Sequence, residues 1–149
     1  MDEFHTRKHI RLENYDYKEG NTVFVTVCVA DRKKLLGSIQ KPPSAAEEPV
    51  IQLSEMGRIV SFYTETICGV IKYVIMPNHV HMIVENAEGE SISEKMRAWK
   101  SLITRKIGVG IWQRSFYDHV IRDEEDFRIR WKYIDDNPAK WASDPYFQK

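Results

Sequence analysis

The sequence predicts a domain of the α+β class, with one antiparallel sheet of four to five strands packed against helices. Short runs rich in valine, isoleucine and threonine alternate with longer runs whose apolar residues recur every three or four positions. Two of the short runs are separated by only three residues, so their strands must pair as an antiparallel hairpin. The chain has 149 residues, of which 42% are hydrophobic and 30% are charged, as in a single globular domain. We therefore expect one domain over residues 1–149.

The first half of the chain contains a strand, a loop and a helix. Residues 21–30 are rich in Val, Phe and Thr and predict a buried strand. Residues 38–49 contain three prolines and several small or acidic residues, which predict a surface loop. Ser54 is a typical helix cap and precedes a run with one apolar face. That face consists of Ile59, Val60, Tyr63 and Ile67.

A hairpin and a second helix follow. Residues 69–75 and 79–85 predict two strands, and the proline and asparagine between them favour a turn. Ser91 and Glu94 match a capping box, which predicts that a helix begins there and ends at Gly108 and Gly110. The apolar stripe of this helix consists of Ile92, Met96, Trp99, Ile103 and Ile107.

The last elements are a strand over residues 111–121 and a helix from about Asp123 to Asn137. Pro138 ends this helix because the residue before a proline avoids helical geometry. We expect its stripe of Phe127, Trp131 and Ile134 to pack on the sheet. Apart from this last helix, the order of elements is the split βαβ arrangement of a ferredoxin-like sheet, with two helices on one face.

His79, Val80 and His81 form the sharpest local motif. Side chains alternate along a strand, so both imidazoles project from the same face and could chelate one divalent ion. Such patterns also occur by chance on solvated strand faces. The flanking residues are apolar, however, and two polar rings in the middle of such a strand require a reason.

Charge and composition limit the classes of partner. The chain has 22 basic and 22 acidic residues, so it does not coat nucleic acid by bulk charge, although a local basic face remains possible. No stretch approaches the roughly 18 apolar residues of a membrane span, and we expect no signal peptide. Cys28 and Cys68 lie in apolar contexts, so we expect reduced, buried thiols in a cytoplasmic protein.

Tyr133 and Asn137 lie four residues apart on the last helix. This spacing places them about 40° apart, beside the apolar stripe, where a side chain could reach the sheet face. A tyrosine beside an apolar stripe is more often a core-edge residue, and an asparagine before proline often only ends a helix. The residues alone leave both interpretations open.

Three segments together resemble one known family. YVIMPNHVHMIVE, WQRSFYDHVIRDEEDF and KYIDDNPAKW, in this order, resemble the REP-associated branch of the single-tyrosine HUH transposases. The opening segment HIRLENYDYKEGNTVFVTVCVADRKKLLG is similar to the same group, so the resemblance spans most of the chain. It implies that His79 and His81 are the metal-binding pair, that Tyr133 is the nucleophile on the C-terminal helix, and that Asn137 is a third metal ligand. Tyr117 is a lower-ranked rival nucleophile, and we expect His119 to be a strand-face residue or, less readily, a supporting contact near the metal.

The resemblance also implies the reaction and the partners. Tyr133 would form a covalent bond to a DNA 5′ phosphate and release a 3′ hydroxyl, and attack by a 3′ hydroxyl would rejoin the strands. The amide oxygen and the substrate oxygens suit a hard ion such as Mg²⁺ or Mn²⁺, whereas the two imidazoles are also compatible with zinc. The expected substrate is single-stranded or hairpin DNA, which implies a nucleoid-associated protein. We expect DNA contacts from Arg7, Lys8 and Arg11, then Arg114, with Trp112 as a stacking surface or a core residue.

Two other functions and two assemblies remain open at this point. The chain could be a regulatory DNA-binding module of the same fold, although such a module has no need of the four site residues. It could also be a metal-dependent phosphoesterase that uses water instead of tyrosine. A monomer and a homodimer are both compatible with the sequence.

Overall fold

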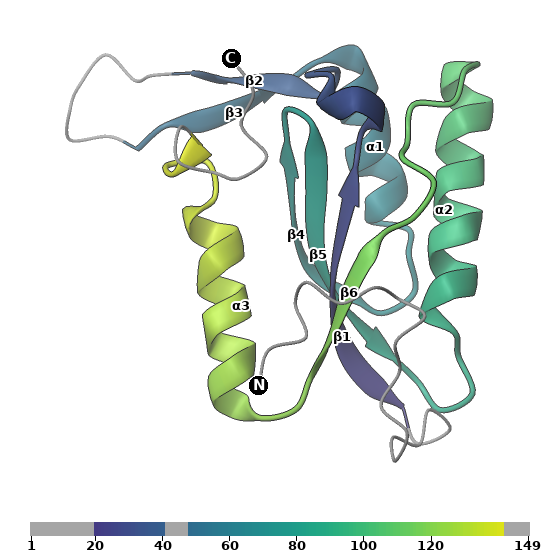
Figure 1. The fold of residues 1–149 in the computed structure, drawn as a ribbon, viewed down its shortest axis with the longest axis vertical. Helices are drawn as coiled ribbons and strands as arrows, with labels where there is room; N and C mark the ends of the chain where they lie inside the picture. The colour runs from purple at the N-terminus through teal and green to yellow at the C-terminus, as the bar shows by residue number, and fades with distance from the viewer. Residues whose placement is uncertain (1–19, 41–47, 142–149) are drawn as a thin grey trace.

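The computed structural model describes residues 20–40 and 48–141, which form three α-helices and six strands. The elements in chain order are β1 (Asn21–Cys28), the short 3₁₀ helix η2 (Ala30–Arg32), β2 (Gly37–Gln40), β3 (Val50–Leu53), α1 (Glu55–Thr64), β4 (Val70–Met76), β5 (His79–Asn86), α2 (Ile92–Ile107), β6 (Tyr117–Ile121) and α3 (Glu124–Asp136). Figure 1 shows their arrangement, with a four-stranded sheet at the centre.

The main sheet is antiparallel and has the strand order β4-β5-β1-β6. The first strand therefore lies in the interior of the sheet, between the second strand of the β4–β5 hairpin and the last strand, as a split βαβ arrangement requires. This observation confirms the α+β prediction, with four strands in the sheet.

The two faces of the sheet carry different helices (Figure 1). Side chains alternate along β1, so Val23, Val25 and Val27 point to the face covered by α1 and α2, where the larger hydrophobic core lies. Phe24 points to the opposite face and packs in a smaller cluster with Ile134 of α3. The apolar core is thus concentrated on one face, and the other face carries the polar side chains discussed below.

The predicted helix starts agree with the structure. Ser54 accepts a hydrogen bond from the Gly57 amide at the start of α1, and Ser91 accepts one from Glu94 at the start of α2. Asp123 caps α3 in the same way. Gly108 ends α2 in the left-handed conformation, with a φ of 97°, which a residue without a Cβ adopts most readily.

Residues 38–49 do not form the continuous loop that was predicted. Residues 38–40 belong to β2, which pairs with β3 in a separate two-stranded sheet, and residues 41–47 lie outside the described part of the chain. The prolines at 42, 43 and 49 lie outside the two strands, so they do not prevent Ile39 from pairing with Ile51.

The structure corrects three further details. β6 begins at Tyr117, because the preceding residues follow an irregular path whose carbonyls at Gln113 and Ser115 are bound by Lys100. Trp131 is 37% exposed and lies outside the packed face of α3. Cys68 is exposed, whereas Cys28 is buried as expected. No helix in the described ranges combines the length and apolar character needed to cross a membrane.

Candidate active site

His79 and His81 lie side by side on β5, on the sheet face that α3 covers. Their rings are 4.6 Å apart between centroids and inclined by 72°, and neither side chain is exposed. Val80 points into the opposite core. The alternation of a β-strand therefore places the two imidazoles together, as predicted.

Each imidazole is oriented by a neighbouring polar side chain. His79 Nδ1 lies 2.8 Å from Asn78 Oδ1, and His81 Nδ1 lies 2.7 Å from Thr26 Oγ1 on the adjacent strand. Because the Asn78 oxygen can only accept, His79 carries its proton on Nδ1, and the Nε2 lone pair is the one that could bind a metal. Side chains that fix a tautomer in this way are typical of metal-ligating histidines.

Burial keeps both rings neutral. It lowers the pKa of His79 to about 3; the Asn137 side chain opposes this shift, and the positive charge of Arg32 adds to it. Burial also lowers the pKa of His81 well below its ordinary value, with a smaller contribution from His79. Neutral imidazole is the form that binds a metal ion, so the site is ready for ligation at physiological pH.

Asn137 completes a possible ligand set. It is the C-terminal cap of α3 and is only 3% exposed. Its Nδ2 donates to the Tyr133 carbonyl at 3.2 Å, whereas its buried Oδ1 accepts no hydrogen bond from the described residues. A buried carbonyl oxygen without a donor is costly, and a cation would satisfy it. The described ranges contain no cluster of three His, Cys, Asp or Glu side chains suited to a metal, and the Asn137 amide oxygen is the candidate third ligand.

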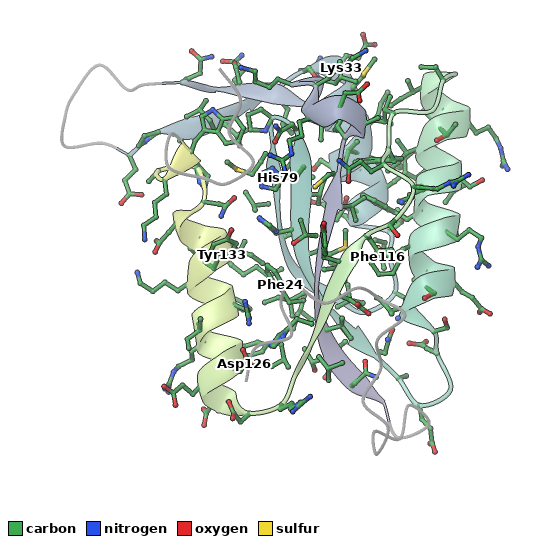
Figure 2. The ribbon with its side chains drawn as sticks, in the orientation of Figure 1. Phe24, Lys33, His79, Phe116, Asp126 and Tyr133 are labelled. Atoms are coloured by element: carbon green, nitrogen blue, oxygen red, sulfur yellow. The ribbon has the colours of Figure 1, made fainter. Side chains whose placement is uncertain are left out.

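Tyr133 projects from α3 toward the histidines, as Figure 2 shows. Its ring lies 5.1 Å from the His81 ring and 6.0 Å from Phe24, both in edge-on geometry. Phe24 in turn stacks on His81 at 5.3 Å. Trp141, beyond the end of α3, stacks on His79 at 6.2 Å. A phenol, two imidazoles and an amide from distant parts of one chain therefore meet on one sheet face.

Comparisons with known proteins point to one family. No family model matches the chain. A Haemophilus influenzae protein, provisionally named a REP-associated tyrosine transposase, is 28% identical over 87% of this chain and 77% of its own length. An Escherichia coli K12 REP-associated tyrosine transposase is 37% identical over 70 residues, which are 46% of this chain and 42% of that protein. A solved REP-associated tyrosine transposase, bound to a REP hairpin, has a TM-score of 0.61 and 26% identity, covering 88% of this chain and 74% of its own. The chain is therefore similar to REP-associated tyrosine transposases in both sequence and fold.

Two further residues that the family resemblance drew attention to lie on the same sheet face. Tyr117 pairs in register with Thr26, which pairs with His81, so Tyr117 is two strands away, or about 10 Å between backbones. His119 binds Asp126 at 2.7 Å and lies 3.3 Å from an Arg130 nitrogen, so it links the sheet to α3. This placement matches the strand-face interpretation of His119.

Only some of the expected DNA contacts lie in the part of the chain that the structure describes. Arg7, Lys8 and Arg11 lie outside the described residues. Arg114 is exposed and lines a hollow of about 250 Å³ beside α2. Trp112 packs on Trp99 at 4.9 Å in the core under α1 and α2, which favours its core role over base stacking.

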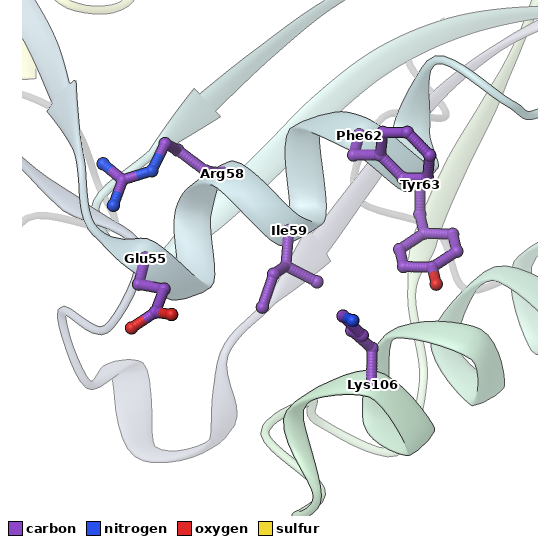
Figure 3. A pocket seen from close by; sticks show the side chains of 6 residues that line it. All are labelled: Glu55, Arg58, Ile59, Phe62, Tyr63 and Lys106. Carbon is purple, nitrogen blue, oxygen red and sulfur yellow. The ribbon is translucent and has the colours of Figure 1, made fainter.

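Another hollow lies away from the histidines. It has a volume of about 420 Å³ and lies between α1 and the end of α2, on the opposite side of the sheet (Figure 3). Its lining residues are Glu55, Arg58, Ile59, Phe62, Tyr63 and Lys106. No group of the candidate site reaches it.

The sequence did not identify the side chains that orient the histidines. Thr26 was interpreted as a strand residue and Asn78 as a turn residue, and neither was assigned a side-chain role. One signal was available for Thr26, because an alternating strand paired beside β5 must direct some polar side chain toward the histidine face.

Proposed function

We propose that this chain is a metal-dependent DNA transposase that breaks and rejoins single-stranded or hairpin DNA through Tyr133. The observation that carries the proposal is the edge contact of the Tyr133 ring with His81, one helical turn before Asn137. DNA enters the proposal through the relatives, one of which is bound to a REP hairpin. The buried, oriented imidazoles support the metal assignment.

The residues of the chain divide the work of the reaction. His79, His81 and Asn137 would hold a divalent ion, Mg²⁺ or Mn²⁺, and that ion would offset the negative charge of the phosphate oxygens. Tyr133 Oη attacks phosphorus and forms a 5′ phosphotyrosine bond while the bond from phosphorus to the 3′ oxygen breaks. The Tyr133 phenol gives up its proton in this step, and the departing oxygen takes up one proton and leaves as a 3′ hydroxyl. The reverse attack by a 3′ hydroxyl releases Tyr133 and rejoins the DNA.

The phenol is held by rings of its own chain. Phe24 and His81 contact Tyr133, and the Tyr133 carbonyl accepts from Asn137, so the nucleophile and the third ligand share one helix end. We propose that one chain forms the site without a nucleophile from a second copy. A monomer that forms a DNA adduct would support this arrangement.

The test is covalent capture of DNA. The protein is incubated with Mn²⁺ and a pool of single-stranded and hairpin oligonucleotides with randomised sequence, then denatured, and any DNA bound to protein is sequenced. The random pool prevents one unsuitable sequence from giving a false negative. We expect an adduct with the wild type and with Tyr117→Phe, but none with Tyr133→Phe.

The other outcomes separate the alternatives. DNA cleavage that survives Tyr133→Phe without an adduct would indicate a water-using phosphoesterase. DNA binding without cleavage by the wild type would indicate a binding module. If the adduct is lost in Tyr117→Phe and retained in Tyr133→Phe, the nucleophile is Tyr117 on β6 instead of Tyr133.

A further inference from the structure

A loop wraps around the tip of the β4–β5 hairpin, next to the histidines. The Val29 amide donates to the Asn78 carbonyl at 2.9 Å, and the Leu36 amide donates to the Pro77 carbonyl at 2.9 Å. Residues 29–36 are therefore attached at both ends to the two-residue turn that precedes His79. Figure 2 shows Lys33 of this loop at the same end of the sheet as His79.

One buried side chain links this loop to the metal-binding pair. Asn78 is not exposed, and its Oδ1 accepts from His79 while its Nδ2 donates to the Arg32 carbonyl at 3.2 Å. The side-chain amide of Asn78 is planar, so it fixes the position of the Arg32 backbone relative to the His79 ring. A change in the position of one must be transmitted to the other.

The backbone at the tip of the loop is in an unusual conformation. Asp31 and Arg32 have φ values of 57° and 55°, in the left-handed region that L residues with a Cβ avoid. Neither is glycine or asparagine, so the loop keeps this shape against local preference, and the Asn78 hydrogen bond contributes to holding it. Such strain is common where a side chain must be presented to a ligand.

The loop presents a cation to the site. Arg32 is exposed at the surface, and its backbone carbonyl is bound by Asn78, the residue that also orients His79. A guanidinium can bind two phosphate oxygens at once, which suits a DNA backbone placed against the histidines.

We propose that Arg32 binds a backbone phosphate of the DNA strand at the His79–His81 site, and that Asn78 is the positioning residue that fixes Arg32 relative to His79. This inference rests on the proposed function, since it assumes that the bound polymer is DNA. It adds a contact that lies apart from the expected contacts at Arg7, Lys8, Arg11, Arg114 and Trp112.

The test measures equilibrium DNA binding without chemistry. Each variant is made in a Tyr133→Phe background, and its affinity for a captured oligonucleotide or, failing capture, a hairpin pool is measured by fluorescence anisotropy at several salt concentrations. Arg32→Asn removes the guanidinium and tolerates the left-handed backbone. We expect it to weaken binding about tenfold or more and to reduce the salt dependence by about one phosphate contact. Lys106→Gln, with the same change in charge near the far hollow, should bind DNA normally.

Two further variants separate a specific contact from a general effect of charge. Lys33→Gln removes the neighbouring cation and should weaken binding much less than Arg32→Asn. Asn78→Ala should weaken binding as well, and adding Arg32→Asn to it should cost little more, because both changes remove the same contact. Mn²⁺ binding by Arg32→Asn should equal that of the parent protein, which excludes a collapsed metal site.

The failures of the two proposals are distinguishable. If the parent protein binds no DNA, the proposed function itself fails. If the parent binds DNA and Arg32→Asn binds with the same affinity and salt dependence, or if Lys33→Gln has an equal effect, the Arg32 contact is wrong. Fully additive effects of Arg32→Asn and Asn78→Ala would overturn the positioning role of Asn78.

Discussion

Replacing Thr26 with valine should weaken metal binding without removing any metal ligand. Thr26 is fully buried on β1, and its hydroxyl lies 2.7 Å from His81 Nδ1. Valine has nearly the same shape and suits a strand, so the exchange removes the hydrogen bond and leaves the packing almost unchanged. The His81 ring then loses the partner that fixes its orientation.

The expected size follows from that single contact. Taking a hydrogen-bond partner from a buried polar group costs about 1–3 kcal/mol of stability. Loss of a contact that orients a metal-ligating histidine typically weakens metal binding about 10- to 100-fold, or about 1.4–2.7 kcal/mol. The loss of stability and the loss of metal affinity have the same source, which is the misplaced His81 ring.

The assay compares Mn²⁺ affinity by calorimetry with urea unfolding in a chelator. Thr22→Val is the matched control, because Thr22 lies on the same face of the same strand and pairs with Glu85 instead of a histidine. We expect Thr26→Val to lose both affinity and stability, Thr22→Val to keep its affinity, and His81→Ala to lose binding entirely. If Thr26→Val binds Mn²⁺ as tightly as the wild type while His81→Ala does not, the hydroxyl does not orient the ligand. If the wild type shows no Mn²⁺ binding, the metal assignment itself is wrong.

Three other changes test the elements around the site. Ile134→Ala should cost about 2–5 kcal/mol of unfolding free energy, because Ile134 is the buried anchor of α3, whereas Ile129→Ala at a residue 56% exposed should cost little; chemical denaturation measures both. Burial would raise the pKa of Asp126, but hydrogen bonding and charge from His119, and then Arg130, lower it on balance, so Asp126 stabilises the fold at neutral pH and this contribution is lost as the pH falls below about 4. Asp126→Asn should remove that part of the acid dependence in unfolding curves, and an unchanged curve would contradict it. Gly57→Ala should lower the melting temperature by several degrees, since a Cβ at this buried helix position would collide with the Leu36 carbonyl; an unchanged melting temperature would show that the backbone gives way.

The sequence could predict those parts of the site that follow from the regular repeat of side chains along a strand or helix. The two histidines share a face because side chains alternate along a regular strand, and α3 ends at Asp136, close to the predicted position. The reason given for that end was wrong, because Asn137, the residue before Pro138, keeps a helical φ of −57° and ψ of −47°. The helix stripe was less certain, because Phe127, Trp131 and Ile134 and the neighbouring Tyr133 could satisfy more than one packed face. In the structure, Phe127, Tyr133 and Ile134 pack on the sheet face that carries the imidazoles, whereas Trp131 remains partly exposed.

Contacts between distant segments could not be predicted in this way. Asparagine is common in turns, so nothing in the sequence indicated that the Asn78 side chain has a further role. Its hydrogen-bond partner Arg32 is 46 residues away. The β2–β3 pairing was missed because a proline-rich connection predicts a loop and carries no signal for the strands on either side. The contact between Asn78 and Arg32 joins segments that are far apart in the sequence, whereas β2 and β3 are consecutive strands whose pairing the prolines between them concealed.

The division of the sheet into two faces has a consequence for the reaction. The histidines are fixed in the centre of the sheet by hydrogen bonds to Asn78 and Thr26, with neighbouring strands on both sides of β5. The tyrosine is carried by α3, which buries only Ile134 completely, whereas α2 buries four of its residues. The other attachments of α3 include the partly exposed ion pairs of Asp126 and Asp135, which water and salt can replace. The helix that carries Tyr133 and ends at Asn137 is therefore less firmly anchored than α2, while the two histidines are held in the sheet. In the proposed reaction, a small movement of this helix would let the 3′ hydroxyl approach the phosphorus that Tyr133 holds, while His79 and His81 keep their positions.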